Sequence, residues 1–256
     1  MKIDRRRFIF STALVTGIPG MISSLKAAPL TKDVLKPVIP QPDNILVGVI
    51  AKADNPEDDL MIVREMGIHV CQVTIGEYSP VLAKKLKATL EKYDIKATSM
   101  ICSLPGPEIY TFREGPQTIG LIPRKYRKDR IERIRQGIDF CTEAGIPAIQ
   151  SHFGFIPENP NDELYKEFIE TMKPLGDYAL KNGIDIYFET GQETPVTLLR
   201  AITDIGTGNL FVNYDTANLI LYGKANPVDG LKVIGKYVRS LHAKDGKYPA
   251  DPYKLG

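Results

Sequence analysis

Cysteine, long apolar runs and net charge are all scarce in this chain of 256 residues. The three cysteines are odd in number and show no paired spacing of the kind that holds a metal: Cys71, Cys102 and Cys141. We therefore expect small buried thiols rather than a disulfide framework. The chain also has only three histidines, too few for a cluster of several metals. Its length suits one large α/β domain.

The lack of a long apolar run matters most near the N-terminus. Three consecutive arginines at positions 5–7 precede an apolar stretch at residues 11–22, and small residues follow it. The stretch is shorter than the ~20 residues that cross a bilayer. A basic start, a short apolar segment and small residues are typical of an export signal, and paired arginines indicate the twin-arginine route. We expect residues 1–28 to be this signal and the protein to be periplasmic, with no stable membrane anchor after signal removal.

Removal of that signal would reverse the sign of the net charge. Residues 1–28 carry five basic side chains and one acidic one, and the whole chain has a formal charge of +2, so the remainder has a charge of −2. A slightly acidic protein lacks the basic face that neutralises phosphates. We therefore expect no nucleic-acid partner.

Beyond a proline-rich linker at residues 29–43, apolar runs alternate with helical patterns. Seven runs are predicted as strands: 45–53, 69–76, 95–104, 148–155, 184–189, 210–215 and 237–242. Helices are predicted between them at 56–66, 80–93, 126–144, 161–181, 195–205 and 227–237. Strands that alternate with helices indicate a parallel sheet. No G-x-G-x-x-G follows the first strand, and polar residues gather where strands end, which favours a (β/α)₈ TIM barrel over residues 44–256.

Three of the predicted strands end in a residue that can bind a metal: Glu189, Asp215 and His242. Successive members are 26 and 27 residues apart, which fits one strand, one helix and two loops. Their side chains should therefore appear at the same level of neighbouring parallel strands. Two carboxylates and one imidazole predict a site for one divalent metal, with Mn²⁺, Mg²⁺ or Co²⁺ favoured and Zn²⁺ as an alternative.

The segments around these residues resemble a known family. FETGQET at 188–194, NYDTANL at 213–219 and LHAKDG at 241–246 are similar to the sugar phosphate isomerase/epimerase family, part of the xylose-isomerase-like TIM-barrel superfamily. The resemblance covers the chain from about its first predicted strand onward. In that family, a Glu, an Asp, a His and a second Glu bind one divalent metal, and the two glutamates exchange protons beside a carbonyl. The resemblance implies that the triad supplies the first three ligands.

The resemblance also implies a fourth ligand, a glutamate on an eighth strand. The chain has seven recognisable strands and ends fourteen residues after His242. We therefore expect the last βα unit to be missing from this sequence through truncation. A seven-stranded barrel would leave two strand edges unpaired.

The resemblance implies enediolate chemistry on a ketose-type sugar, which these residues could support. Such chemistry removes a proton beside a carbonyl, and a metal stabilises the charge that develops. Glu189 is the candidate base as well as a ligand. His152, at the end of the fourth strand, is a second catalytic candidate as a proton shuttle; a structural hydrogen bond to a loop is its alternative role.

Three further polar residues on the same rim are candidates for substrate binding. Gln192 and Asn218 are placed to recognise hydroxyl groups, and Lys244 to hold a substrate oxygen. A salt bridge from Lys244 to Asp245 or Glu193 is the alternative. The long loop at residues 105–123 is either a lid or an ordered surface excursion.

The sequence thus favours an exported, metal-dependent sugar isomerase or epimerase with a small-molecule sugar as substrate. A keto-sugar lyase or hydratase on the same metal site is one alternative, and a non-catalytic or degenerate sugar-binding barrel is another. The apurinic endonuclease branch of the superfamily is disfavoured, because it needs many histidines and Asn218 stands where its D-x-x-H pattern has one. Both a monomer and an oligomer are compatible with the sequence.

Overall fold

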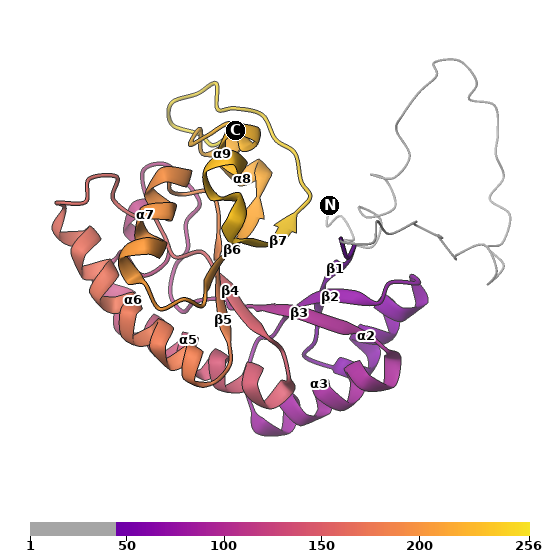
Figure 1. Ribbon diagram of the computed structural model, residues 1–256. Helices are drawn as coiled ribbons and strands as arrows, with labels where there is room; N and C mark the ends of the chain where they lie inside the picture. The colour runs from indigo at the N-terminus through magenta and orange to yellow at the C-terminus, as the bar shows by residue number, and fades with distance from the viewer. Residues whose placement is uncertain (1–44) are drawn as a thin grey trace, which may run out of the picture. The chain divides into compact units, whose positions relative to one another are not determined.

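The computed structural model describes residues 45–256. The predicted export signal at residues 1–28 and the predicted linker at residues 29–43 lie outside the described residues, and both stay predictions. In the described part, seven parallel strands curve into an open barrel, and helices pack on the outer side of the sheet (Figure 1). The predicted α/β barrel architecture is confirmed.

One sheet contains all seven strands in sequence order. They are β1 (Val49–Lys52), β2 (Val70–Thr74), β3 (Lys96–Ile101), β4 (Ala148–Ser151), β5 (Asp185–Glu189), β6 (Leu210–Asp215) and β7 (Val238–His242). Every neighbouring pair is parallel, so the carboxyl ends of all strands meet at one rim. Within the described residues, β1 and β7 each pair with a single strand, which leaves two open edges as predicted.

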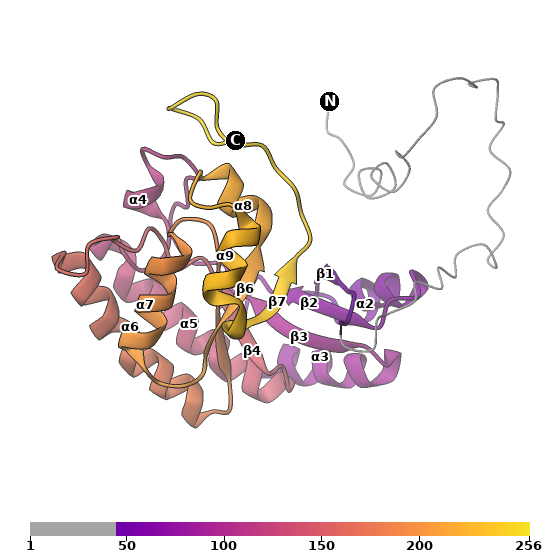
Figure 2. The same ribbon diagram turned by 45° about the horizontal axis from the view of Figure 1, so that its top comes forward.

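The helices connect successive strands and cover the convex side of the sheet (Figures 1 and 2). They are α2 (Pro56–Glu65), α3 (Pro80–Tyr93), α4 (Gly115–Thr118), α5 (Arg124–Ala144), α6 (Glu163–Lys181), α7 (Pro195–Ile205), α8 (Thr216–Leu221) and α9 (Pro227–Ile234), with a 3₁₀ turn at Gly235–Tyr237. None of those in residues 45–256 combines the length and apolar character that a membrane crossing requires.

Local sequence explains where the main helices begin and end. The Ser79 hydroxyl accepts a hydrogen bond from the backbone N–H of Leu82, and Pro80 fixes the first turn of α3. Helices α5 and α7 end at Gly145 and Gly206, whose φ angles of 73° and 70° lie in the left-handed region that glycine adopts without strain. These signals are local, and α3 and α7 have the predicted bounds.

The apolar side chains between sheet and helices form one contiguous core. Phe168 of α6 is fully buried, and the Phe188 ring of β5 lies 4.5 Å from the ring of Phe153, centroid to centroid. Each such side chain stabilises the fold by about 1.5–3 kcal/mol. All three cysteines are buried free thiols, as predicted. Because the core supplies the stability, the rim can carry polar side chains.

The predicted bounds differ from the structure at several elements, and the short helices α4 and α8 were not predicted. The first strand was predicted at 45–53 but spans only Val49–Lys52, because its ladder to β2 begins at Val49. The fourth strand ends at Ser151 rather than 155, where its pairing with β5 stops. Helix α8 was not predicted, since it has only six residues and starts immediately after β6.

Candidate active site

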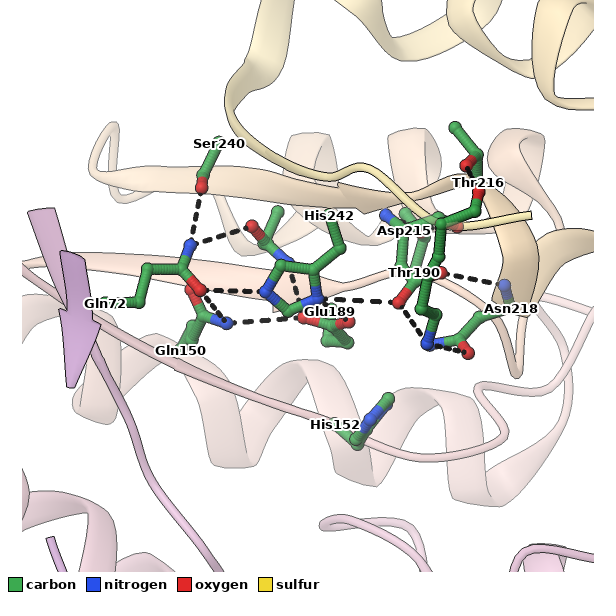
Figure 3. A network of polar contacts seen from close by, with 12 residues as sticks. Gln72, Gln150, His152, Glu189, Thr190, Asp215, Thr216, Asn218, Ser240 and His242 are labelled. Atoms are coloured by element: carbon green, nitrogen blue, oxygen red, sulfur yellow. Dashed lines mark hydrogen bonds and ion pairs between the residues drawn. The ribbon is translucent and has the colours of Figure 1, made fainter. Parts of the chain in front are cut away.

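The predicted metal-binding triad lies at the carboxyl ends of three neighbouring strands. Glu189, Asp215 and His242 are the last residues of β5, β6 and β7. Asp215 is in register with His242, and Glu189 is in register with Asn213. Residues two apart on a strand face the same side, so Asn213 and Asp215 both contact residues of the barrel interior. Figure 3 shows the three triad side chains converging.

The triad is tightly packed and poorly accessible to water. Nδ1 of His242 lies 2.8 Å from Oε1 of Glu189 and 3.4 Å from Oδ2 of Asp215. The exposed fractions of the Glu189 and Asp215 side chains are 6% and 0%. One potential ligand atom from each residue lies within 4.8 Å of the other two, and within residues 45–256 no other group of three shares this geometry.

Two basic side chains face the buried carboxylates. Nζ of Lys244 lies 2.6 Å from Oδ2 of Asp215. Burial opposes ionisation of Asp215, but hydrogen bonds from His242 and Lys244 outweigh it and lower its pKa to about 2. Burial also opposes protonation of His242, yet its hydrogen bonds to Asp215 and Glu189 raise its pKa to about 9. The site therefore gathers positive charge around the carboxylates.

This donor set fits a divalent cation. Carboxylate oxygens with one imidazole nitrogen suit Mn²⁺, Mg²⁺ or Co²⁺, and the ligand atoms converge enough to share one ion. A bound metal would take the place of a proton on His242. It would also supply the positive charge that Lys244 otherwise provides to Asp215. Glu189, Asp215 and His242 are the residues that would hold it.

Lys244 and Asn218, predicted to bind substrate, both contact the Asp215 carboxylate. The backbone N–H of Asn218 donates to Oδ1 of Asp215 over 2.9 Å, which caps α8. Nζ of Lys244 donates to Oδ1 of Asn218 over 3.0 Å. The alternative prediction, a salt bridge from Lys244 to Asp245 or Glu193, is wrong. The ammonium of Lys244 forms its salt bridge with Asp215 instead.

His152 lies apart from the triad, on the loop after β4 (Figure 3). Its Nδ1 is 3.1 Å from Oε1 of Gln192, and its ring meets the edge of Tyr110 with 5.6 Å between centroids. Burial lowers the pKa of His152, which keeps the ring neutral near pH 7. The structure thus joins two predicted site residues, His152 and Gln192, to each other rather than to the triad.

A cavity of about 1240 Å³ opens beside the triad. Its wall includes six of the seven predicted site residues: His152, Glu189, Gln192, Asn218, His242 and Lys244. The seventh, Asp215, is fully buried. Glu108, Tyr110 and Tyr222 also line the cavity, and burial raises the pKa of Glu108. The sequence analysis singled out the loop at residues 105–123 but assigned no separate role to Glu108, Tyr110 or Tyr222.

The loop at residues 105–123 is anchored at both ends to α5. Arg130 of α5, fully buried, donates from its guanidinium to the carbonyl oxygens of Pro105, Pro107 and Gly120 over 2.9, 2.9 and 2.6 Å. A buried guanidinium with satisfied donors holds both ends of the loop. The loop therefore presents Glu108 and Tyr110 in a fixed position.

A layer of polar side chains lies beneath the triad inside the barrel. Its members come from five strands and are Gln72, Ser99, Gln150, Asn213 and Ser240. Hydrogen bonds join them to each other and to the triad. Figure 3 shows Gln72, Gln150 and Ser240 beside the triad. Sequence reasoning missed this layer, although single glutamines in apolar strands were the available signal.

Residues 60–254 match the family described as xylose isomerase-like TIM barrel. A xylose isomerase domain protein from Planctomyces limnophilus is 28% identical, with a TM-score of 0.76, and the match covers 82% of this chain and 79% of that one. No curated protein matches this chain.

Two more distant structures share the fold. One is a 3-keto-D-glucoside 4-epimerase from E. coli, with 13% identity, a TM-score of 0.58, and coverage of 77% of this chain and 78% of that one. The other is a D-psicose 3-epimerase solved with D-fructose, with 14% identity, a TM-score of 0.58, and coverage of 77% and 72%. The family match spans most of the described residues, including all three triad positions. The chain belongs to the xylose isomerase-like TIM barrel family.

Proposed function

We propose that this protein is a divalent-metal-dependent sugar isomerase or epimerase that acts on a ketose-type substrate through an enediolate. The observation that carries the proposal is the convergence of Glu189, Asp215 and His242 beside a cavity of about 1240 Å³. The epimerases with the same fold, one of them solved with a ketose, support the substrate class.

A metal bound at the triad would polarise the substrate carbonyl and stabilise the charge that develops when a neighbouring carbon loses its proton. Glu189 is the proposed base. Its Oε2 accepts hydrogen bonds from the side-chain amides of Asn213 and Gln150, which fixes the carboxylate plane. Oε1 would take the proton from carbon, and its return to the adjacent carbon would give an isomer. An epimer would require a second acid that protonates the same carbon on its opposite face.

His152 is the proposed second proton carrier. Its Nδ1 donates to Gln192, so Nε2 carries the lone pair and can accept a proton from a substrate hydroxyl. A neutral ring suits this role, and burial keeps His152 neutral. Gln192 and Asn218 line the same cavity and would bind hydroxyl groups, while Lys244 would hold a substrate oxygen once a metal balances Asp215.

We further propose that the protein works in the periplasm after twin-arginine export. The signal-like residues 1–28 support this location. Sugar phosphates are mainly cytoplasmic, so free ketoses and 3-keto-glycosides are the proposed substrates.

The test is proton exchange between substrate and solvent. Purified full-length protein with Mg²⁺ or Mn²⁺ would be incubated in deuterated water with a panel of free ketoses and 3-keto-glycosides. Deuterium at a carbon beside the carbonyl, together with an epimer or isomer, is the expected result. A product lacking one water would assign a lyase or hydratase instead, and no exchange in any substrate would overturn the shared mechanism. Glu189→Gln is the inactive control.

A further inference from the structure

Four side chains from four strands form a closed ring of hydrogen bonds that includes two of the three candidate metal ligands. Asn213 donates from Nδ2 to Oε2 of Glu189, and Nε2 of Gln72 donates to Oδ1 of Asn213 over 3.3 Å. Oε1 of Gln72 lies 2.8 Å from Nε2 of His242, and Nδ1 of His242 lies 2.8 Å from Oε1 of Glu189. Figure 3 shows Gln72 and Glu189 on either side of the imidazole.

The ring has one consistent direction of donors and acceptors. An ionised carboxylate only accepts hydrogen bonds, so the Asn213 group that faces Glu189 must be its amide nitrogen. The Asn213 oxygen then faces Gln72, which must turn its own nitrogen toward it. This leaves the Gln72 oxygen facing His242, whose Nε2 must therefore carry a proton and donate it.

From this direction we propose that Gln72 and Asn213 are positioning residues that make Nδ1 the metal-binding nitrogen of His242. The inference rests on the proposed metal site and adds which atom binds and what selects it. With Nε2–H held by Gln72, the ring can present a lone pair only at Nδ1, the atom that faces both carboxylates. Partners of this kind fix the tautomer and orientation of a histidine ligand.

The location of Gln72 argues against a role confined to packing. It lies on β2, while Asn213, Ser240 and His242 lie on β6 and β7 at the opposite end of the sheet order. Its side chain is 7% exposed and makes a further hydrogen bond of 2.6 Å to Oγ of Ser240. An apolar residue would fill the same space without the cost of burying an amide. The Gln72 amide instead joins β2 to β6 and β7 by hydrogen bonds at the level of the triad.

The first experiment identifies the binding nitrogen in the unmodified protein. Side-chain ¹⁵N NMR of the full chain would be recorded before and after addition of Zn²⁺, a diamagnetic probe. With three histidines in the chain, single substitutions assign the signals. The expected result is a Zn²⁺-dependent shift of Nδ1 of His242, with Nε2 protonated throughout. Coordination through Nε2 of His242 would overturn the proposal.

The second experiment tests what selects that nitrogen. Gln72→Met keeps the length of the side chain but cannot accept a hydrogen bond, whereas Gln72→Glu keeps the acceptor. By calorimetry, Q72M should bind Zn²⁺ about 10- to 100-fold more weakly than the wild type, and Q72E should bind it more tightly than Q72M. Gln136→Met, at an exposed glutamine of α5, is the matched control. Wild-type affinity in Q72M would overturn the role of Gln72.

These outcomes separate the inference from the proposed function. Coordination through Nδ1 without turnover of any ketose would retain the positioning role and reject the enzyme activity. Turnover of a ketose together with coordination through Nε2 would retain the enzyme activity and reject the positioning role.

Discussion

The ammonium of Lys244 lies 2.6 Å from Oδ2 of Asp215, and the Asp215 side chain is completely buried. A carboxylate that is shielded from water requires a cationic partner, and Lys244 shares this role with His242. A bound metal would supply the same positive charge. With the proposed metal in place, Lys244 would couple the stability of the rim to metal binding and would become available for a substrate oxygen.

Replacing Lys244 by methionine should destabilise the metal-free protein more than the metal-bound one. Breaking a buried ion pair costs about 3–5 kcal/mol. Because the Lys244 side chain is 45% exposed, solvent screening reduces the expected loss to roughly 1–2 kcal/mol. Denaturant unfolding with and without Mn²⁺ measures the difference. Lys247→Met, at an exposed lysine, serves as control, and an equal loss in both conditions would contradict the account.

Stability should fall as the pH rises through the titration of Glu193. Burial raises the pKa of this carboxyl group from 4.5 to about 8, so the folded protein binds the proton more tightly than the unfolded chain. The stabilisation is therefore complete below pH 4.5 and is lost as the pH rises through about 8. Melting temperatures from pH 5 to 9 should decline less steeply in Glu193→Gln than in wild type. Glu91→Gln, at an exposed site, should leave the slope unchanged, and an unchanged slope in E193Q would reject this explanation.

Removing the guanidinium of Arg130 should loosen the loop that forms one wall of the cavity. Arg130→Met leaves three carbonyl oxygens without their donor, each loss costing about 1–3 kcal/mol if the group stays buried. We expect a loss of stability of at least about 2 kcal/mol and faster amide hydrogen exchange at residues 105–120. Arg113→Met changes an exposed arginine of the same loop and should affect neither measurement. Unchanged exchange in R130M would show that the loop is held by other contacts.

Substitution of His152 should impair catalysis without affecting metal binding. His152 contacts Gln192 and Tyr110 but none of the triad residues. His152→Asn should lower kcat by about 10²-fold or more, as expected when a proton carrier is lost. The affinity for Mn²⁺ should equal that of the wild type. His69→Gln, immediately before β2 and away from the rim, is the comparison variant. A large loss of metal affinity in H152N would reassign His152 to the metal site.

Much of the fold was predictable because its signals are local. Ser79 with Pro80 and Thr194 with Pro195 mark the starts of α3 and α7, which have the predicted bounds. Helix α8 was missed because its N-cap is Asp215, a residue that also ends β6 and belongs to the triad. Asp215 is at once the last residue of β6, the N-cap of α8 and a member of the triad, so the sequence holds no separate signal for the start of the helix.

The triad was predictable from spacing, but the contacts around it were not. Parallel strands at regular intervals bring Glu189, Asp215 and His242 to one rim in any barrel of this kind. The hydrogen bond between Gln72 and His242, by contrast, joins residues 170 positions apart and depends on the curvature of the sheet. The pairing of Lys244 with Asp215 was missed for the same reason, since sequence reasoning considered nearer charges.

The count of metal ions bound per chain tests the central claim most directly. Wild-type protein and Asp215→Asn would be loaded with Mn²⁺, dialysed and analysed for metal, with folding checked by circular dichroism. We expect one Mn²⁺ per wild-type chain and essentially none in the variant, because the variant loses a buried anionic ligand. Wild-type protein without bound metal, or equal metal in the two proteins, would contradict the assignment of the triad as a metal centre.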